Sequence, residues 1–226
     1  MIFNWIDAGF MATIKVTTGA GATVTCVQSP YSYSATANSS GVATFTVYTK
    51  GNWVITSTKN GLTNTSTQNM QTAAETRNVA LPLRYWIFKA GEGPKVNYIS
   101  YVMGSPSVTN ARITTTPSFI LDNAMVVADG QYYYRRESGV TFTINLSNYS
   151  KFVTDIQHSG SSVQQIAYVV KSVPYAQPGD HMIYQFTSPT RSTVSYDISS
   201  ITGNKYISIY NKGNITATIY NWYLEV

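Results

Sequence analysis

Short runs of alternating apolar and polar residues cover the first third of the chain. Such alternation puts apolar side chains on one face of a β-strand and polar side chains on the other. Strands are therefore expected at 13–17, 22–27, 31–35, 42–48, 53–58, 63–67 and 78–83. Asn60-Gly61 is the strongest hairpin signal, because both residues tolerate the positive φ angles of a tight turn. These closely spaced strands predict a small β-sandwich over 11–83, with Phe45 and Trp53 in its core.

Alternation continues beyond residue 84, but the composition changes. The segment 84–226 holds 15 of the 18 tyrosines. Strands are expected at 85–88, 96–103, 111–115, 119–128, 131–135, 140–145, 149–157, 164–170, 181–186, 192–197, 204–210 and 214–225. Only 121–127 competes as a helix, and it is short. So many strands predict a second all-β domain over 84–226, a jelly roll or a related sandwich.

The first ten residues form a separate apolar arm. Four large apolar side chains are too many for a free tail: Phe3, Trp5, Ile6 and Phe10. We expect the arm to anchor the protein by docking on a neighbouring subunit, or to fold back on its own domain. It lacks a basic leader and carries Asp7, so it is a poor signal peptide.

Charged residues are only 11% of the chain, less than half the usual share, and Ser, Thr, Asn, Tyr and Gly take their place. A neutral, hydroxyl-rich surface is more typical of extracellular or virion surfaces than of metabolic enzymes. The net charge is +5, but the basic residues are scattered along the chain, which argues against nucleic-acid binding. No run of 18 apolar residues predicts a membrane span. The single cysteine, Cys26, cannot form an intrachain disulfide and is expected to be a buried or half-buried small apolar residue.

The motifs at 21–25, 40–45, 51–56 and 79–83 together resemble a known repeat. They are similar to the immunoglobulin-like or prealbumin-like module related to the carboxypeptidase regulatory domain. That module recurs in bacterial surface proteins and in virion proteins of tailed phages. The resemblance covers about residues 11–83, and it implies a fold rather than a chemistry.

The segments 140–152, 193–209 and 219–225 carry a second, looser resemblance, to the galactose-binding-like jelly roll. Many carbohydrate-binding modules and the terminal domains of phage structural proteins use this fold. It implies sugar binding only loosely, since many members are purely structural.

Catalytic chemistry finds little support in the sequence. His158 and His181 each lie beside a turn and are expected to be solvated. Asp180 and His181 are neighbours, and neighbours in a strand point to opposite faces, which disfavours a catalytic triad. No zinc spacing occurs, so no cofactor is expected, although a structural calcium is compatible with scattered acids. Its candidate ligands are Asp122, Asp129, Asp155 and Glu225. Paired carboxylates for glycoside hydrolysis stay open as an alternative.

Aromatic residues beside basic ones give the candidate ligand site. Tyr132, Tyr134, Arg135 and Arg136 belong to one run whose rings occupy both faces of a strand, so one face is expected to be exposed. Exposed rings with polar neighbours suit sugar stacking. Tyr175, in the loop 175–180, is a second candidate. The alternative is sheet packing, since tyrosine is favoured in strands.

The stretch 196–210 predicts a strand, a turn and a strand. Ile198, Ile207 and Ile209 are expected on one buried face. Gly203 is expected to take a positive φ, and Asp197 to accept hydrogen bonds from backbone amides of the turn.

These patterns favour a non-enzymatic structural protein on the surface of a tailed-phage virion. It would be made in the host cytoplasm and decorate the capsid or tail in many copies. Its partners would be other virion proteins and host glycans, with neither nucleic acid nor membrane among them. The alternatives are a bacterial cell-surface carbohydrate-binding or adhesin module and a glycan hydrolase.

Overall fold

The computed structural model describes residues 9–96, 99–103, 112–114, 119–122, 126–128, 131–133, 137–158, 165–171, 182–186, 189–212 and 216–226. Within these ranges the chain is all-β, with a single 3-10 turn, Leu146–Asn148. The chain forms two compact units, one of Met1–Tyr85 with Glu225–Val226 and the other of Trp86–Leu224. The expected all-β class with sandwich architecture is confirmed.

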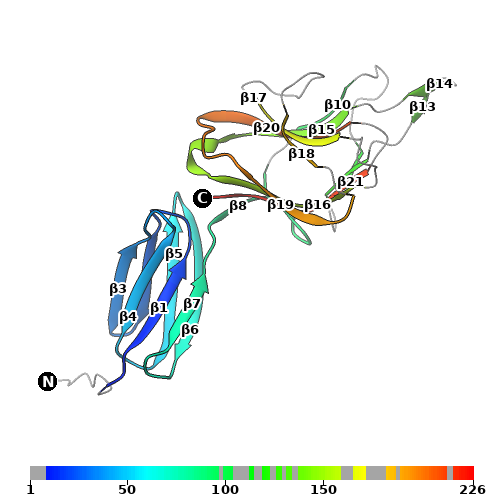
Figure 1. Cartoon of the computed structure of the whole chain (residues 1–226). Coiled ribbons are helices and arrows are strands. Elements are labelled where there is room, and N and C mark those ends of the chain that lie inside the picture. Colours follow the sequence, from blue (N-terminus) through cyan, green and yellow to red (C-terminus); the bar gives the residue numbers. More distant parts are fainter. Residues whose placement is uncertain are drawn as a thin grey trace. The chain divides into compact units, whose positions relative to one another are not determined.

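Two sheets, in which most neighbouring strands are antiparallel, build the first unit (Figure 1). One sheet has the order β4-β1-β7, formed by Val42–Val47, Ala12–Thr17 and Thr76–Ala80. The other has the order β3-β2-β5-β6, formed by Tyr31–Thr36, Thr23–Gln28, Gly51–Lys59 and Leu62–Met70. Strand β1 runs antiparallel to β4 and parallel to β7. All seven strands lie where alternation predicts them.

The core of this unit lies between the two sheets. Trp53 is fully buried, its ring stacks 5.6 Å from Tyr33, and its indole nitrogen donates to the Thr49 carbonyl at 3.2 Å. Phe45 is also buried, so both expected core aromatics are confirmed. Cys26 is buried as expected, and burial raises the pKa of its thiol to about 12. The thiol therefore stays protonated and is a poor nucleophile.

Side chains and positive φ angles fix the turns of this unit. Asn60 and Gly61 have φ angles of 52° and 77°, which confirms the expected hairpin. Gly41 has a φ of 72°, and the Asn38 side-chain oxygen accepts from the amides of Ser40 and Val42. Such local hydrogen bonds let the chain reverse without a helix.

The outward face of the sheet β3-β2-β5-β6 is uncharged and rich in hydroxyls. The pairing register aligns its side chains into three rows across the four strands. The rows are Thr36, Thr23, Thr58 and Thr63; Ser34, Thr25, Thr56 and Thr65; and Ser32, Val27, Val54 and Thr67. Val27 and Val54, paired on the two central strands, are 38% and 42% exposed. The low content of charged residues in the chain is thus visible on this face, which carries none in these three rows.

Two facing sheets also build the second unit (Figure 1). The first has the order β10-β15-β20-β17-β18, formed by Ile99–Met103, Glu137–Asn145, Asn204–Lys212, Gln165–Lys171 and Met182–Phe186. The second has the order β11-β12-β21-β16-β19, formed by Arg112–Thr114, Phe119–Asp122, Thr216–Glu225, Lys151–His158 and Ser192–Asp197. Strand β8, Arg84–Lys89, pairs with β21 and with the short β9, Gly93–Pro94. Strands β13, Val126–Ala128, and β14, Gln131–Tyr133, form a separate hairpin.

Side chains from both sheets meet in the core of the second unit. Trp222 of β21 contacts Phe142 of β15 edge to face, with ring centroids 5.4 Å apart. Phe152, Ile207 and Leu224 are fully buried. His158 ends strand β16 and is only 3% exposed, so the expectation of a solvated loop histidine is wrong. The strand runs one residue further than predicted, and its inward face includes His158. His181 lies outside the described residues.

The stretch 196–210 has the expected architecture. Ile198 and Ile207 are fully buried, whereas the side chain of Ile209 lies outside the described residues. Gly203 has a φ of 77°, and the Asp197 carboxylate accepts from the Ser199 amide at 2.8 Å. Hydrogen bonds from Ser199 lower the pKa of the Asp197 carboxyl. This stretch is therefore a structural connection that caps its own turn.

Replacing Gly203 by valine is expected to destabilise the second unit by about 1–2 kcal/mol, the cost of a left-handed backbone for a residue with a Cβ. An added Cβ would meet no atom within 4 Å, so the loss comes from conformation and not from a clash. Gly203→Asn should cost less, because asparagine tolerates this region. Urea unfolding followed by circular dichroism measures both. Equal losses for the two variants would contradict this cause.

Candidate functional site

The sheet β11-β12-β21-β16-β19 turns one face to the core and the other outward. In β16, Phe152, Thr154 and Ile156 are buried and face the core, and the alternate positions face the other way. On that second face Val153 is also buried, Asp155 is half-buried and Gln157 is exposed. Asp155 and Gln157 belong to that face, and Asp155 stands opposite Thr193 of β19. Simple alternation thus sets a carboxylate and an amide side by side, two positions apart.

Strand β21 presents two consecutive side chains to this outward face. Ala217 and Ile219, at odd-numbered positions, are buried, and so are Trp222 and Leu224, at even-numbered positions. The core-facing side chains therefore change from odd to even positions between Ile219 and Trp222. Tyr220 and Asn221 therefore both face outward, which is the effect of a β-bulge. Their contacts agree: Tyr220 bonds to Gln157, and Asn221 bonds to Asp155. The shift brings a phenol and an amide next to the two polar residues of β16.

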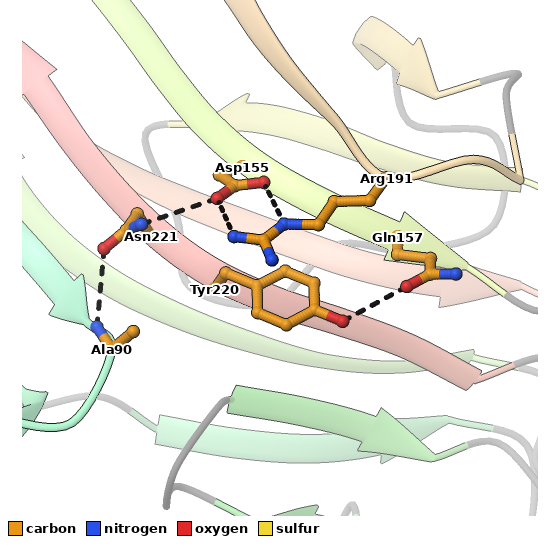
Figure 2. Close-up of polar contacts among 6 residues, drawn as sticks. All are labelled: Ala90, Asp155, Gln157, Arg191, Tyr220 and Asn221. Carbon is orange, nitrogen blue, oxygen red and sulfur yellow. Dashed lines mark hydrogen bonds and ion pairs between the residues drawn. The ribbon is translucent and has the colours of Figure 1, made fainter.

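Arg191, just before β19, completes the group (Figure 2). Its Nε donates to Asp155 Oδ1 at 3.0 Å, and its Nη2 donates to Asp155 Oδ2 at 2.7 Å. The guanidinium also lies over the Tyr220 ring, with its central carbon 3.7 Å from the ring centroid. A bidentate ion pair and a ring contact together hold the guanidinium plane in place.

Further hydrogen bonds fix the remaining members. The Tyr220 hydroxyl donates to Gln157 Oε1 at 3.1 Å. Asn221 Oδ1 accepts from the Ala90 amide at 3.4 Å, and Asn221 Nδ2 lies 3.5 Å from Asp155 Oδ2 (Figure 2). We call Asp155, Gln157, Arg191, Tyr220 and Asn221 the outer-face cluster. It is a connected polar network on a sheet, with its side chains pre-positioned.

An aromatic pair lies next along β21. Tyr223 is two residues beyond Asn221 and contacts Trp86 of β8, with ring centroids 4.8 Å apart. Lys89 Nζ lies 5.5 Å from the Trp86 ring centroid and forms an ion pair with Glu92. Two residues along a strand span about 7 Å. Tyr223 is only 9% exposed, so Trp86 is the one partly exposed ring of this pair beside the polar network.

Hydrogen bonds and neighbouring charges favour the ionised forms of the Arg191, Glu92 and Asp197 side chains. Hydrogen bonding to Asp155 raises the pKa of the Arg191 guanidinium, so it stays charged. Side-chain hydrogen bonds from Lys89 and Lys95 lower the pKa of Glu92. A general acid for glycoside hydrolysis needs a raised pKa, and Glu92 and Asp197 are shifted the other way.

Two of the proposed calcium ligands bind arginines. Asp155 pairs with Arg191, and Glu225 pairs with Arg84 at 3.1 Å. Within the part of the chain that the structure describes, no three His, Cys, Asp or Glu side chains gather as for a metal ion. In the same described part, no helix has the length and apolarity to cross a membrane.

The predicted ligand and anchoring residues are placed only in part. Tyr132 lies in β14, opposite Val127 of β13. Phe10 is 4% exposed and belongs to the core of the first unit. The other predicted residues lie outside the described residues: Tyr134, Arg135, Arg136, Tyr175, Phe3, Trp5 and Ile6. For these, the binding and anchoring roles stay predictions.

The sequence did not single out the outer-face cluster. In the sequence, Asp155 is only a candidate calcium ligand, and Tyr220 is one of the 15 tyrosines of 84–226. The members come from three segments up to 66 residues apart. The one local signal is the pattern of β21, where the apolar residues change from odd-numbered to even-numbered positions around Tyr220 and Asn221.

Comparisons with known proteins give distant likenesses in structure. No protein-family model matches the chain, and no curated protein matches it. One structure, from work on carbohydrate-binding modules of the β-sandwich superfamily, matches with a TM-score of 0.30 and 9% identity. The match covers 89% of this chain and 84% of that chain.

Two further structures match at the same level. A structure of CBM51-2 and INT domains from Clostridium perfringens ZmpB, in complex with GlcNAc, matches with a TM-score of 0.31 and 14% identity, over 79% of this chain and 38% of that one. The major pilin subunit BcpA of Bacillus cereus, as its D312A variant, matches with a TM-score of 0.29 and 11% identity, over 93% and 58%. TM-scores this low establish no shared ligand. The strands themselves define the class: an all-β protein of two β-sandwich units.

Proposed function

We propose that the second unit is a non-catalytic glycan-binding module and that the outer-face cluster is its ligand surface. The observation that carries the proposal is the bonded network of Asp155, Arg191 and Tyr220 on an outward sheet face. The side-chain polar groups of this network point away from the core and are held in fixed positions. Such fixed polar groups lower the entropy lost on binding.

The chemical composition of the face suits sugars. A sugar ring offers adjacent hydroxyls that donate and accept hydrogen bonds, and its C–H faces pack on aromatic rings. The Arg191 guanidinium and the Gln157 amide supply donors for sugar oxygens, and the partly exposed Trp86 supplies a ring nearby.

Removing the ring of Tyr220 is expected to weaken glycan binding at least about tenfold, the factor for about 1.4 kcal/mol. The Tyr220→Ala variant loses the surface under Arg191 and the hydrogen bond to Gln157, so the guanidinium is no longer held. A glycan array identifies a ligand for the intact chain, and calorimetric titration with that ligand compares the variants.

Thr143→Ala is the matched control for this titration. Thr143 is an exposed residue of β15 in the opposite sheet and has no part in the cluster, so its affinity should equal that of the unchanged protein. Amide NMR spectra of both variants check that the unit stays folded. An unchanged affinity in Tyr220→Ala, or an array without any bound glycan, would remove the proposal.

For the setting, we propose a many-copy surface protein, either on the particle of a tailed phage or on a bacterial cell. The uncharged hydroxyl face of the first unit, with the exposed Val27 and Val54 on its central strands, supports a place among packed copies. Many copies turn weak single sites into strong attachment. Immunogold labelling of intact phage particles and of intact bacterial cells separates the two settings: labelled particles support the phage setting, and labelled cells support the bacterial one.

A further inference from the structure

The hydrogen-bonding groups of the outer-face cluster are used unequally. Asp155 accepts through both of its oxygens, from Arg191 and at longer range from Asn221. Gln157 Oε1 accepts from the Tyr220 hydroxyl, and Asn221 Oδ1 accepts from the Ala90 amide. Every side-chain acceptor on an Asp, Asn or Gln of the cluster therefore already receives a hydrogen bond from within the protein.

The donors of the cluster are used less completely. A guanidinium carries five N–H groups, and Arg191 gives only those on Nε and Nη2 that reach Asp155. The edge between Nη1 and Nη2 makes no hydrogen bond within the described part of the chain. The amide nitrogen of Gln157 likewise donates to no described residue, and both side chains are exposed.

A guanidinium has two edges that each match a carboxylate. Asp155 occupies the edge formed by Nε and Nη2, and the Tyr220 ring lies against the plane. Figure 2 shows Nη1 on the side of the guanidinium away from Asp155. The remaining edge is therefore held in orientation, and the Arg191 side chain as a whole is 52% exposed. Planar bidentate binding of a second carboxylate fits this edge.

We propose that the outer-face cluster recognises acidic glycans through the carboxylate of a sugar acid. The carboxylate accepts from Nη1 and Nη2 of Arg191, and Gln157 donates to a neighbouring sugar oxygen. The ion pair with Asp155 neutralises Arg191 formally, so the selectivity comes from directed hydrogen bonds and not from a strong local field. The net charge of +5 adds a weak general attraction for acidic polymers. This inference rests on the proposed glycan-binding function and specifies its ligand class.

The test compares one sugar in two forms. Oligogalacturonate and its methyl ester share rings and linkages and differ in the charge and acceptor geometry of the carboxyl group. Calorimetric or NMR titration of the full chain is expected to give at least about tenfold tighter binding of the free acid. A second pair, sialyllactose and lactose, tests whether the preference extends beyond uronic acids.

Variants of Arg191 separate geometry from charge. Arg191→Gln should abolish the preference for the acid, and Arg191→Lys should lose most of it, because an ammonium keeps the charge but not the planar fork. Gln157→Glu should weaken binding of the acid more than binding of the ester, because both sugars lose the amide donor and only the acid is also repelled by the new carboxylate. Lys151→Gln is the matched control: it removes one positive charge from the same sheet face outside the cluster and should keep the preference.

The outcomes distinguish the two proposals. Equal binding of acid and ester overturns the acidic-ligand inference and leaves glycan binding intact. Failure of both acidic and neutral sugars to bind overturns both. Tighter binding of sulfated oligosaccharides than of carboxylated ones overturns the assignment to sugar acids. A loss of preference in Lys151→Gln equal to that in Arg191→Gln, with the preference kept in Arg191→Lys, would also overturn it, by making overall charge the cause.

Discussion

Replacing Trp53 by alanine is expected to destabilise the first unit by about 3–5 kcal/mol, the usual cost of deleting a buried indole. The ring is fully buried between the sheets and lies against both Tyr31 and Tyr33. Its removal loses apolar burial, leaves a cavity and strips the Thr49 carbonyl of a donor. A loss of this size approaches the whole stability of a small domain.

Hydrogen exchange measured by mass spectrometry is the suitable readout for Trp53→Ala, because it resolves the two units. Peptides of β2, β5 and β6 should lose protection, and peptides of β16 and β21 should keep it. Val54→Ala is the control: it is the next residue of the same strand, faces outward and is 42% exposed. Similar losses of protection in the two variants would show that Trp53 does not hold this core.

Replacing Gly41 by alanine is expected to cost about 3 kcal/mol, which combines a left-handed backbone with a forced clash. Gly41 has a φ of 72°, and an added Cβ would run into the Thr18 carbonyl oxygen. The clash is with backbone, and the Thr18 amide donates to the Gly41 carbonyl at 2.8 Å, so neither strand can shift without loss.

Gly61→Ala is the matched control for Gly41→Ala. Gly61 has nearly the same φ, 77°, and an added Cβ there meets nothing within 4 Å. It should therefore lose only about 1–2 kcal/mol, the conformational part. Urea unfolding of both variants gives the difference directly. If the two losses are equal, the contact with Thr18 contributes nothing.

Much of the first unit follows from local pattern. Alternation located its strands, and Asn60-Gly61 located its clearest hairpin, because strand facing and turn conformation depend on neighbouring residues. In the second unit the same reasoning placed the strands of both sheets and the buried Ile198 and Ile207. It failed at His158, since the end of a strand depends on its partner strand rather than on the local pattern.

The candidate site shows the limit of local reasoning. The sequence favoured Tyr132, Tyr134, Arg135 and Arg136 because they are contiguous, and contiguity is the only proximity that a sequence displays. The outer-face cluster instead joins Asp155 to Arg191, 36 residues away, and to Asn221, 66 residues away. No spacing rule links these positions.

The sequence by itself determined the all-β class, the positions of the strands, the core aromatics of the first unit and the turns at Gly61 and Gly203. Each of these depends on residues close together in the chain. Only the tertiary structure decided which strands are neighbours, since the order β21-β16-β19 sets the last strand of the chain beside β16. The shift of facing at Tyr220 and Asn221 then completed the cluster. Strand order and bulges depend on packing between distant segments, and short-range periodicity does not encode them.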